Sequence, residues 1–201
     1  MSATDPRHPH DQRDPHLAAL HADLVARADA AGDLDVAYRT LDTPIGGLVL
    51  AATPVGLVRV GFADAEGEEA VLADLAARVS PRVLAAPRRL DRAARALEDY
   101  LTGRRREVDV PLDLVLVRGF RREVVTALPR VGYGATASYA EVAALVERPR
   151  AVRAVGTACA TNPLPLALPC HRVVRSDGGE GRYRGGSQVK HALLAMERRL
   201  A

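Results

Sequence analysis

Three short apolar runs that begin at Val36 constrain the fold of this chain more than any other feature. The runs VAYRTLDT, GLVLAAT and GLVRVGFA are separated by TPIGG and TPVG, and the Pro and Gly of these spacers favour tight turns. This alternation predicts an antiparallel meander. Two helical patterns follow, EGEEAVLADLAARV and LDRAARALEDYL, and the second ends at Thr102-Gly103, where glycine permits a left-handed cap. The run VDVPLDLVLV then predicts an extended segment that leads into the second half.

The second half of the sequence predicts helices followed by a loop-rich segment. FRREVVTALPRV has a helical pattern until Pro129, and Ser138 is an N-cap candidate because Glu141, three residues later, completes a capping box. The helix that Ser138 begins, YAEVAALVE, is broken by Arg-Pro-Arg at 148–150, and AVRAVGTACAT begins another helix. Two short helices on either side of a tight break predict a helix-turn-helix.

The helix after this break has two distinct faces at helical spacing. Its apolar face consists of Val152, Val155 and Cys159. Its polar face consists of Arg150, Arg153 and Thr157. We expect the apolar face to pack inward, which makes Cys159 a core residue rather than a catalyst. We expect the arginine face to meet DNA.

Charge divides the chain into two unlike halves. Residues 1–117 carry 14 Lys+Arg against 19 Asp+Glu, a net charge of −5, whereas residues 118–201 carry 14 against 6, a net charge of +8. A basic half beside an acidic one suggests that one domain binds a polyanion, most commonly nucleic acid; a solvated arginine-rich surface is the alternative. We expect an α/β fold, more narrowly α+β, with a tail and short helix over 1–35 and domains over 36–117 and 118–201.

The first 35 residues predict a disordered tail and one helix. MSATDPRHPHDQRDPH has no apolar segment of a signal peptide, and its Pro- and Asp-rich spacing favours disorder over a metal site. The histidines concerned are His8, His10 and His16. Leu17, Leu20 and Leu24 then fall at helical spacing, so we expect a short amphipathic helix that ends near Gly32.

Cysteine usage favours a reduced compartment. Cys159 and Cys170 allow only one disulfide, and no CxxC or Cys/His zinc spacing is present. No run approaches the length of a membrane span. We therefore expect a soluble, cytoplasmic protein without a metal.

The segment Leu164–Val174, LPLALPCHRVV, sets a cysteine, a histidine and an arginine side by side in an otherwise apolar run. A thiolate rather than a thiol attacks carbon, so a reactive Cys170 needs a base or a positive environment, for which His171 and Arg172 are candidates. An inert buried cysteine beside a surface histidine and arginine is the alternative. The motif points to cysteine chemistry rather than to a disulfide.

A longer, ordered set of motifs resembles the O6-alkylguanine-DNA alkyltransferases, also called methylated-DNA–protein-cysteine methyltransferases. The matching motifs are Ser138-Tyr139-Ala140, Arg153-Ala154-Val155-Gly156, Asn162-Pro163, Pro169-Cys170-His171-Arg172-Val173, Ser176-Asp177-Gly178-Gly179, Tyr183-Arg184-Gly185-Gly186, Lys190, Leu193-Leu194 and Glu197. The resemblance extends, with weaker motifs, back to Val36 through the meander and its two helices. It implies a ribonuclease-H-like first domain followed by a winged helix-turn-helix-like alkyltransferase domain.

The resemblance also implies catalytic roles for five residues. Cys170 would accept the alkyl group, His171 would take the thiol proton through a water, and Glu197 would orient the imidazole and stabilise its charged form. Asn162 would be the hinge that holds the reactive loop, and Tyr139 would donate a proton to the departing guanine. The alternatives for the last two are an ordinary Asn-Pro turn and a half-buried aromatic at a helix start.

DNA and substrate contacts are implied in the same way. Arg153 would fill the space left by the flipped nucleotide, because the O6 alkyl group lies against the paired edge of the base. Small residues on the recognition helix would let it enter the minor groove, whose degenerate readout suits a search for damage. The expected DNA contacts are Arg150, Arg153, Ala154, Gly156, Thr157 and Arg172. The expected substrate pocket consists of Val173, Tyr183, Arg184, Gly185 and Gly186.

The resemblance implies repair of double-stranded DNA by transfer of the alkyl group of O6-alkylguanine to Cys170, with O4-alkylthymine as a second candidate substrate. The thioether is not readily reversed, so the protein, a monomer with no obligate protein partner, would be consumed once per lesion without a cofactor. One alternative is a non-enzymatic lesion sensor, which would lack the acceptor cysteine. Another is a winged-helix regulator with a sensing thiol, which leaves Tyr183 and Glu197 without a role.

Three positions depart from the family pattern; one of them is Ser187, which replaces a frequent leucine. Val125 stands where Trp is common, and the chain contains no Trp. Arg184 stands where a small residue is usual, and a long cation there would restrict bulky alkyl groups or grip a phosphate.

Overall fold

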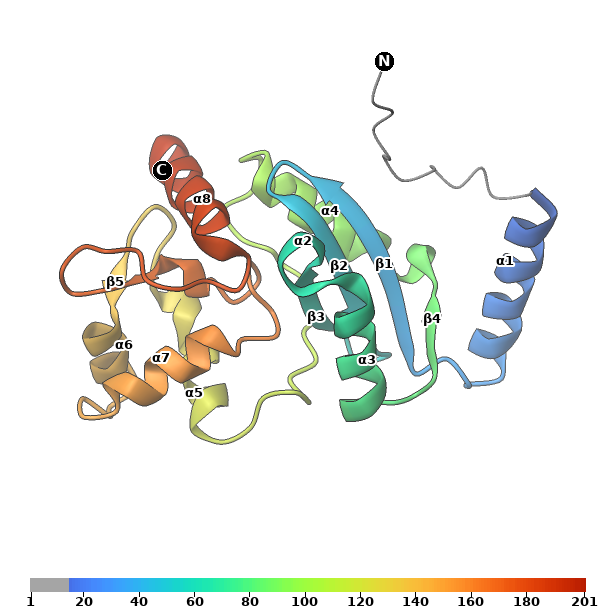
Figure 1. The fold of residues 1–201 in the computed structure, drawn as a ribbon, viewed down its shortest axis with the longest axis horizontal. Helices are drawn as coiled ribbons and strands as arrows, with labels where there is room; N and C mark the ends of the chain where they lie inside the picture. Colours follow the sequence, from blue (N-terminus) through green and yellow to red (C-terminus); the bar gives the residue numbers. More distant parts are fainter. Residues whose placement is uncertain (1–14) are drawn as a thin grey trace, which may run out of the picture.

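A four-stranded sheet with helices on both faces forms the first half of the molecule in the computed structural model, which describes residues 15–201 (Figure 1). The strands are β1 (Val36–Thr43), β2 (Gly46–Ala52), β3 (Leu57–Phe62) and β4 (Val83–Ala85). The sheet order is β3-β2-β1-β4, with β1, β2 and β3 antiparallel, so the predicted meander is confirmed. The sequence analysis missed β4, because three residues are too short for a periodic pattern and only pairing with β1 defines the strand.

Helices cover the two faces of this sheet with separate apolar clusters. The helical segments are α2 (Ala63–Glu66), α3 (Glu68–Arg78), η1 (Pro87–Leu90) and α4 (Asp91–Leu101). Figure 1 shows α3 in front of the sheet and α4 behind it. Val71 and Leu75 of α3 belong to the cluster on one face, whereas Leu97 and Tyr100 of α4 belong to the other. The second cluster continues into the C-terminal half, so α4 packs where the two halves meet. Division of the chain at residue 117 stays a prediction.

The connection between the halves is less regular than predicted. The run VDVPLDLVLV forms no strand; it makes one isolated bridge, between Leu57 and Leu112. Leu57 donates to the carbonyl of Pro111 at 2.9 Å and accepts from the amide of Asp113 at 2.8 Å. The bridge lies at Leu57, the first residue of β3, so pairing there does not extend into a ladder.

The second half is helical, with one two-stranded parallel sheet (Figure 1). Its elements are α5 (Phe120–Ala127), η2 (Leu128–Arg130), β5 (Ala137–Ser138), α6 (Tyr139–Leu145), α7 (Val152–Ala160), η3 (Cys170–Arg172), β6 (Val173–Val174) and α8 (Gly186–Leu200). The predicted capping box is present: the Ser138 hydroxyl accepts from the Glu141 amide, and the Glu141 carboxylate accepts from the Ser138 amide. The pair α6 and α7 forms the predicted helix-turn-helix around the break at 148–150. The mixed α/β fold class is therefore confirmed.

The apolar face of α7 begins one turn later than predicted. Val155 and Cys159 are buried, which confirms that Cys159 is a core residue. Val152 is 36% exposed, because it occupies the first position of the helix.

The N-terminal helix α1 (Pro15–Ala30) is present, but it does not bury the predicted face. Leu17, Leu20 and Leu24 are 61%, 52% and 52% exposed. Instead, Val25 and Ala28 pack on the core, and the His21 ring bonds the carbonyl of Ala85 at 2.6 Å. The face of α1 that packs against the rest of the protein, near the short strand β4, is therefore the one with His21, Val25 and Ala28 rather than the leucine face. His8 and His10 lie outside the described residues.

Candidate active site

The Pro-Cys-His-Arg segment forms one turn of 3₁₀ helix, η3, beneath a loop held by Asn162. The Asn162 amide donates to the carbonyl of Leu168 at 2.7 Å, and its side-chain oxygen accepts from the amide of Leu164 at 3.0 Å. Asn162 is 1% exposed, and these two bonds span the six residues that lead to Cys170. The amide of Cys170 donates to Leu168 at 2.8 Å. Asn162 thus ties the end of α7 to the segment that carries the cysteine.

The carboxylate of Glu197 lies at the centre of a buried polar network. Oε1 lies 2.9 Å from Nε2 of His171, and the Arg172 guanidinium donates to both carboxylate oxygens at 2.9 Å. The amide of Gly134 donates to Oε2 at 3.0 Å. Burial by itself would raise the pKa of Glu197, but the bonds from His171 and Arg172 lower it to about 2. Glu197 is therefore a permanent anion.

Arg172 does not lie on the DNA-facing surface. It is 5% exposed, and its third donor group bonds the carbonyl of Val131 at 2.7 Å. The expectation that Arg172 contacts DNA does not hold in this structure, because the buried carboxylate of Glu197 takes the guanidinium as its counter-ion.

Tyr100 joins the same network from the first half of the chain. Its hydroxyl donates to Oε1 of Glu197 at 2.5 Å and lies 3.2 Å from Nε2 of His171. Sequence reasoning missed it, because the amphipathic pattern of α4 marks Tyr100 as buried without indicating a partner 97 residues away.

His171 is held in its neutral form. It is fully buried, and burial lowers its pKa although Glu197 opposes the shift. Because Nε2 faces the Glu197 carboxylate, that nitrogen carries the hydrogen and Nδ1 keeps its lone pair. Nδ1 is buried without a hydrogen-bond partner. The imidazole can therefore accept a proton at Nδ1.

Cys170 is a protonated thiol in the resting protein. It is 4% exposed, and burial raises its pKa, while Asn162, Lys190 and Arg184 act in the opposite direction. Lys190, whose motif match carried no role in the sequence analysis, is buried beneath the site and donates to the carbonyl of Val173 at 2.6 Å. Burial raises the pKa of Cys159 to about 12, so that thiol stays inert. Cys170 needs a base before its sulfur can attack.

Two tyrosines stand beside Cys170. Tyr139 begins α6 and is half-buried; burial and then the two nearby thiols raise its pKa. Its hydroxyl lies against Gly181, where an added Cβ would approach within 3.0 Å. The ring of Tyr183 makes edge contacts with His171, at a centroid distance of 6.2 Å, and with Phe62 at 5.4 Å. The Tyr183 hydroxyl is buried without a partner.

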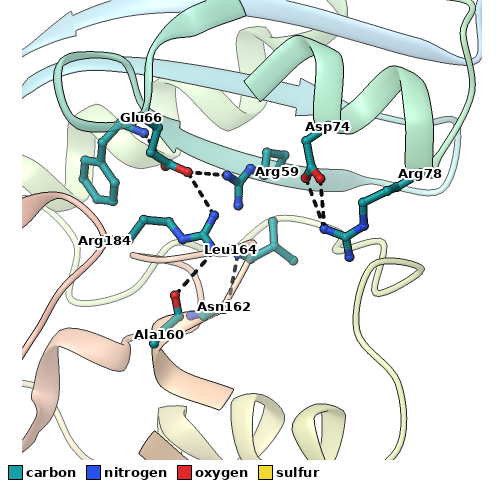
Figure 2. Close-up of polar contacts among 9 residues, drawn as sticks. Arg59, Glu66, Asp74, Arg78, Ala160, Asn162, Leu164 and Arg184 are labelled. Atoms are coloured by element: carbon teal, nitrogen blue, oxygen red, sulfur yellow. Dashed lines mark hydrogen bonds and ion pairs between the residues drawn. The ribbon is translucent and has the colours of Figure 1, made fainter. Parts of the chain in front are cut away.

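The rest of the expected pocket comes from β6, from the loop that leads into α8 and from the first residue of α8. Val173 is buried in β6, and Gly186 has a φ of 87°, a conformation that favours glycine. Gly185 packs so closely on Phe62 that an added Cβ would lie 2.8 Å from the ring. The Arg184 guanidinium contacts Glu66 and the carbonyl of Ala160 (Figure 2).

The expected DNA contacts other than Arg172 lie on or beside the outer face of α7. Its exposed members are Arg150, Arg153, Ala154 and Thr157. Gly156 is partly buried against Tyr139, whose ring lies 4.0 Å from the position of an added Cβ. Within residues 15–201, no three His, Cys, Asp or Glu side chains are grouped to hold a metal ion, and no helix is long and apolar enough to cross a membrane.

Comparison with known proteins defines the class. Residues 36–114 match the family model described as 6-O-methylguanine DNA methyltransferase, ribonuclease-like domain, and residues 119–199 match the DNA binding domain of the same description. The chain therefore belongs to the 6-O-methylguanine DNA methyltransferase family.

Individual relatives agree with this assignment. The chain is 39% identical to the methylated-DNA–protein-cysteine methyltransferase of Mycolicibacterium paratuberculosis over 82% of this chain and 93% of that protein. It is 37% identical to the mouse protein of the same name over 80% of each. Among solved structures, Mycobacterium tuberculosis OGT in complex with DNA superposes with a TM-score of 0.70 at 35% identity, covering 82% of this chain and 94% of that chain.

Proposed function

We propose that this protein is a methylated-DNA–protein-cysteine S-methyltransferase that repairs DNA by moving the alkyl group of O6-alkylguanine to its own Cys170. The observation that carries the proposal is that Cys170 is buried beside a neutral His171. Nε2 of this histidine is held by Glu197, which leaves Nδ1 to accept a proton. Family membership and the names of the relatives support it. A lesion sensor or a thiol-sensing regulator is not favoured, because neither needs this network.

The first chemical step is removal of the thiol proton. Nδ1 of His171 takes the proton of Cys170 through a bridging water, and Glu197 stabilises the imidazolium that forms. The positive charge of Lys190, which lowers the pKa of Cys170, stabilises the thiolate. The network needs no metal or cofactor for this transfer.

The second step is an in-line displacement at the alkyl carbon. The sulfur of Cys170 forms a bond to carbon as the bond between carbon and O6 of guanine breaks, and the hydroxyl of Tyr139 protonates the departing guanine. Tyr183, Gly185, Gly186 and Val173 wall the pocket for the base, and Asn162 holds the reactive loop. The product is a thioether, so one protein molecule repairs one lesion.

DNA binding places the lesion at this site. The exposed face of α7 enters the minor groove of double-stranded DNA through Ala154 and Thr157, with Gly156 beside this face and Arg150 just before the helix. Arg153 occupies the space of the flipped nucleotide. We place the protein in the cytoplasm as a monomer without an obligate protein partner. O4-alkylthymine in DNA is a second candidate substrate.

Intact-mass spectrometry after mixing with duplex DNA that contains O6-methylguanine tests this function. The expected result is a gain of one CH₂ unit, located on Cys170 by peptide mapping and absent in Cys170→Ser. Cys159→Ser is the matched control, because Cys159 belongs to the core, and this variant is expected to gain the same mass. Tight DNA binding with unchanged mass would refute alkyl transfer and favour a sensor.

A further inference from the structure

The loop that walls the candidate pocket is fastened to the first half of the chain by an ion pair (Figure 2). Arg184 donates from Nη1 to Oε2 of Glu66 at 2.9 Å, across 118 residues of sequence. Its Nη2 lies 3.4 Å from the carbonyl oxygen of Ala160, the last residue of α7. A cation is favoured there, because the C-terminal end of a helix carries partial negative charge. One side chain thus connects the pocket loop, the recognition helix and the N-terminal half.

Glu66 is itself firmly placed. Its Oε1 accepts from the amide of Phe62 at 3.0 Å, and its Oε2 also accepts from Arg59. Arg59 is 4% exposed on β3, so its guanidinium depends on Glu66 as counter-ion. Figure 2 shows both guanidinium groups bonded to the same oxygen of the Glu66 carboxylate. The carboxylate is therefore a fixed acceptor rather than a mobile surface group.

The contacts beside the ion pair are close and apolar. The edge contact between Phe62 and Tyr183 and the tight approach of Gly185 to the Phe62 ring bring the loop onto β3 on both sides of Arg184. The loop therefore docks through three consecutive residues. The same loop carries Tyr183, whose ring contacts His171, so its position bears on the site around Cys170.

We propose that Arg184, Glu66 and Arg59 form a clamp by which the N-terminal half positions the pocket loop and the end of the recognition helix for alkyl transfer. All three are positioning residues, since none contacts the reacting atoms. The proposal rests on the proposed alkyl-transfer function. A phosphate contact by Arg184 is the competing role, and the structure favours the clamp because two donor groups of Arg184 already have protein acceptors.

The principal test is Arg184→Ala in the full-length protein. Single-turnover transfer from O6-methylguanine duplex gives the rate constant of the bound complex, and binding of Cys170→Ser forms to the same duplex gives Kd. Loss of the clamp is expected to slow transfer at least about tenfold, because small displacements of a positioned group cost that much or more. Kd is expected to stay within about twofold, and the dependence of Kd on salt is expected to be unchanged. Arg182→Ala is the matched control, because it removes an exposed charge from the same loop and Arg182 makes no side-chain contact of this kind.

A second variant removes the acceptor. Arg59→Met with Glu66→Gln takes away both buried charges together, so neither is left unpaired. Adding Arg184→Ala to this pair is expected to slow transfer no further, because the clamp is already open. Independent slowing by the two changes would overturn the proposal.

A measurement without activity separates this proposal from the function on which it rests. Hydrogen exchange of the amides of residues 181–186 in the free protein is expected to speed up in Arg184→Ala and to stay unchanged in Arg182→Ala. Unchanged exchange in Arg184→Ala, or a weakened Kd with a salt slope reduced by about one, would overturn the clamp. Failure of the unaltered protein to gain mass would instead overturn the proposed function.

Discussion

Replacement of Arg172 by Met tests whether that arginine serves the interior or the DNA surface. The guanidinium makes bonds to both oxygens of Glu197 and one to the carbonyl of Val131, and Glu197 is fully buried. The bonds from Arg172 help to lower the pKa of Glu197, so their removal leaves a buried carboxylate with only His171, Tyr100 and Gly134 as donors. Breaking a buried ion pair costs about 3–5 kcal/mol. In a chain of this size each kcal/mol lowers Tm by about 2–4 °C, so the expected fall is roughly 6–20 °C.

Urea unfolding followed by circular dichroism measures this free energy; the chain has no Trp to report by fluorescence. Arg150→Met is the matched control, because Arg150 is exposed near the start of α7 and its loss is expected to change stability by less than about 0.5 kcal/mol. DNA titrations are expected to show the opposite: Arg150→Met lowers the salt slope of Kd by about one, whereas Arg172→Met leaves this slope unchanged. A stable Arg172→Met protein with the lower salt slope would refute the assignment of Arg172 to the interior.

Three further outcomes are expected. Tyr100→Phe removes a donor from Glu197, so the anion attracts the His171 proton more strongly and the acid limb of the transfer rate against pH moves to higher pH; an unchanged profile contradicts a role for Tyr100 in the network. Burial lowers the pKa of His171, so below about pH 6.5 the unfolded chain binds a proton at this residue more readily than the folded chain does. The free energy of unfolding is therefore expected to keep its full His171 contribution above about pH 6.5 and to lose it as the pH falls. Equal urea midpoints at about pH 7.5 and 5.5 would count against this. Arg153→Ala is expected to slow transfer from duplex DNA far more than transfer to Cys170 from free O6-benzylguanine, and equal slowing of both would argue against insertion into the duplex.

Local patterns in the sequence determined the meander, the capping box at Ser138 and the burial of Cys159, because strand alternation and helical spacing depend only on near neighbours. They did not find β4, which exists through pairing with β1 alone. They also chose the wrong face of α1, where three leucines share a helical face but His21 and Val25 make the contacts.

For the candidate site, the sequence by itself determined which residues are predicted to carry the chemistry. The order of the motifs from Ser138 to Glu197 pointed to Cys170, and helical spacing separated the roles of the two cysteines. Only the tertiary structure decided the partners of the charged and polar groups. Arg172 pairs with Glu197 rather than facing DNA, and Arg184 pairs with Glu66 rather than lining the pocket. Tyr100 of α4 bonds Glu197 within the histidine network. The physical reason is that a buried charge takes the nearest counter-charge that packing provides, and these counter-charges lie 25 to 118 residues away along the chain.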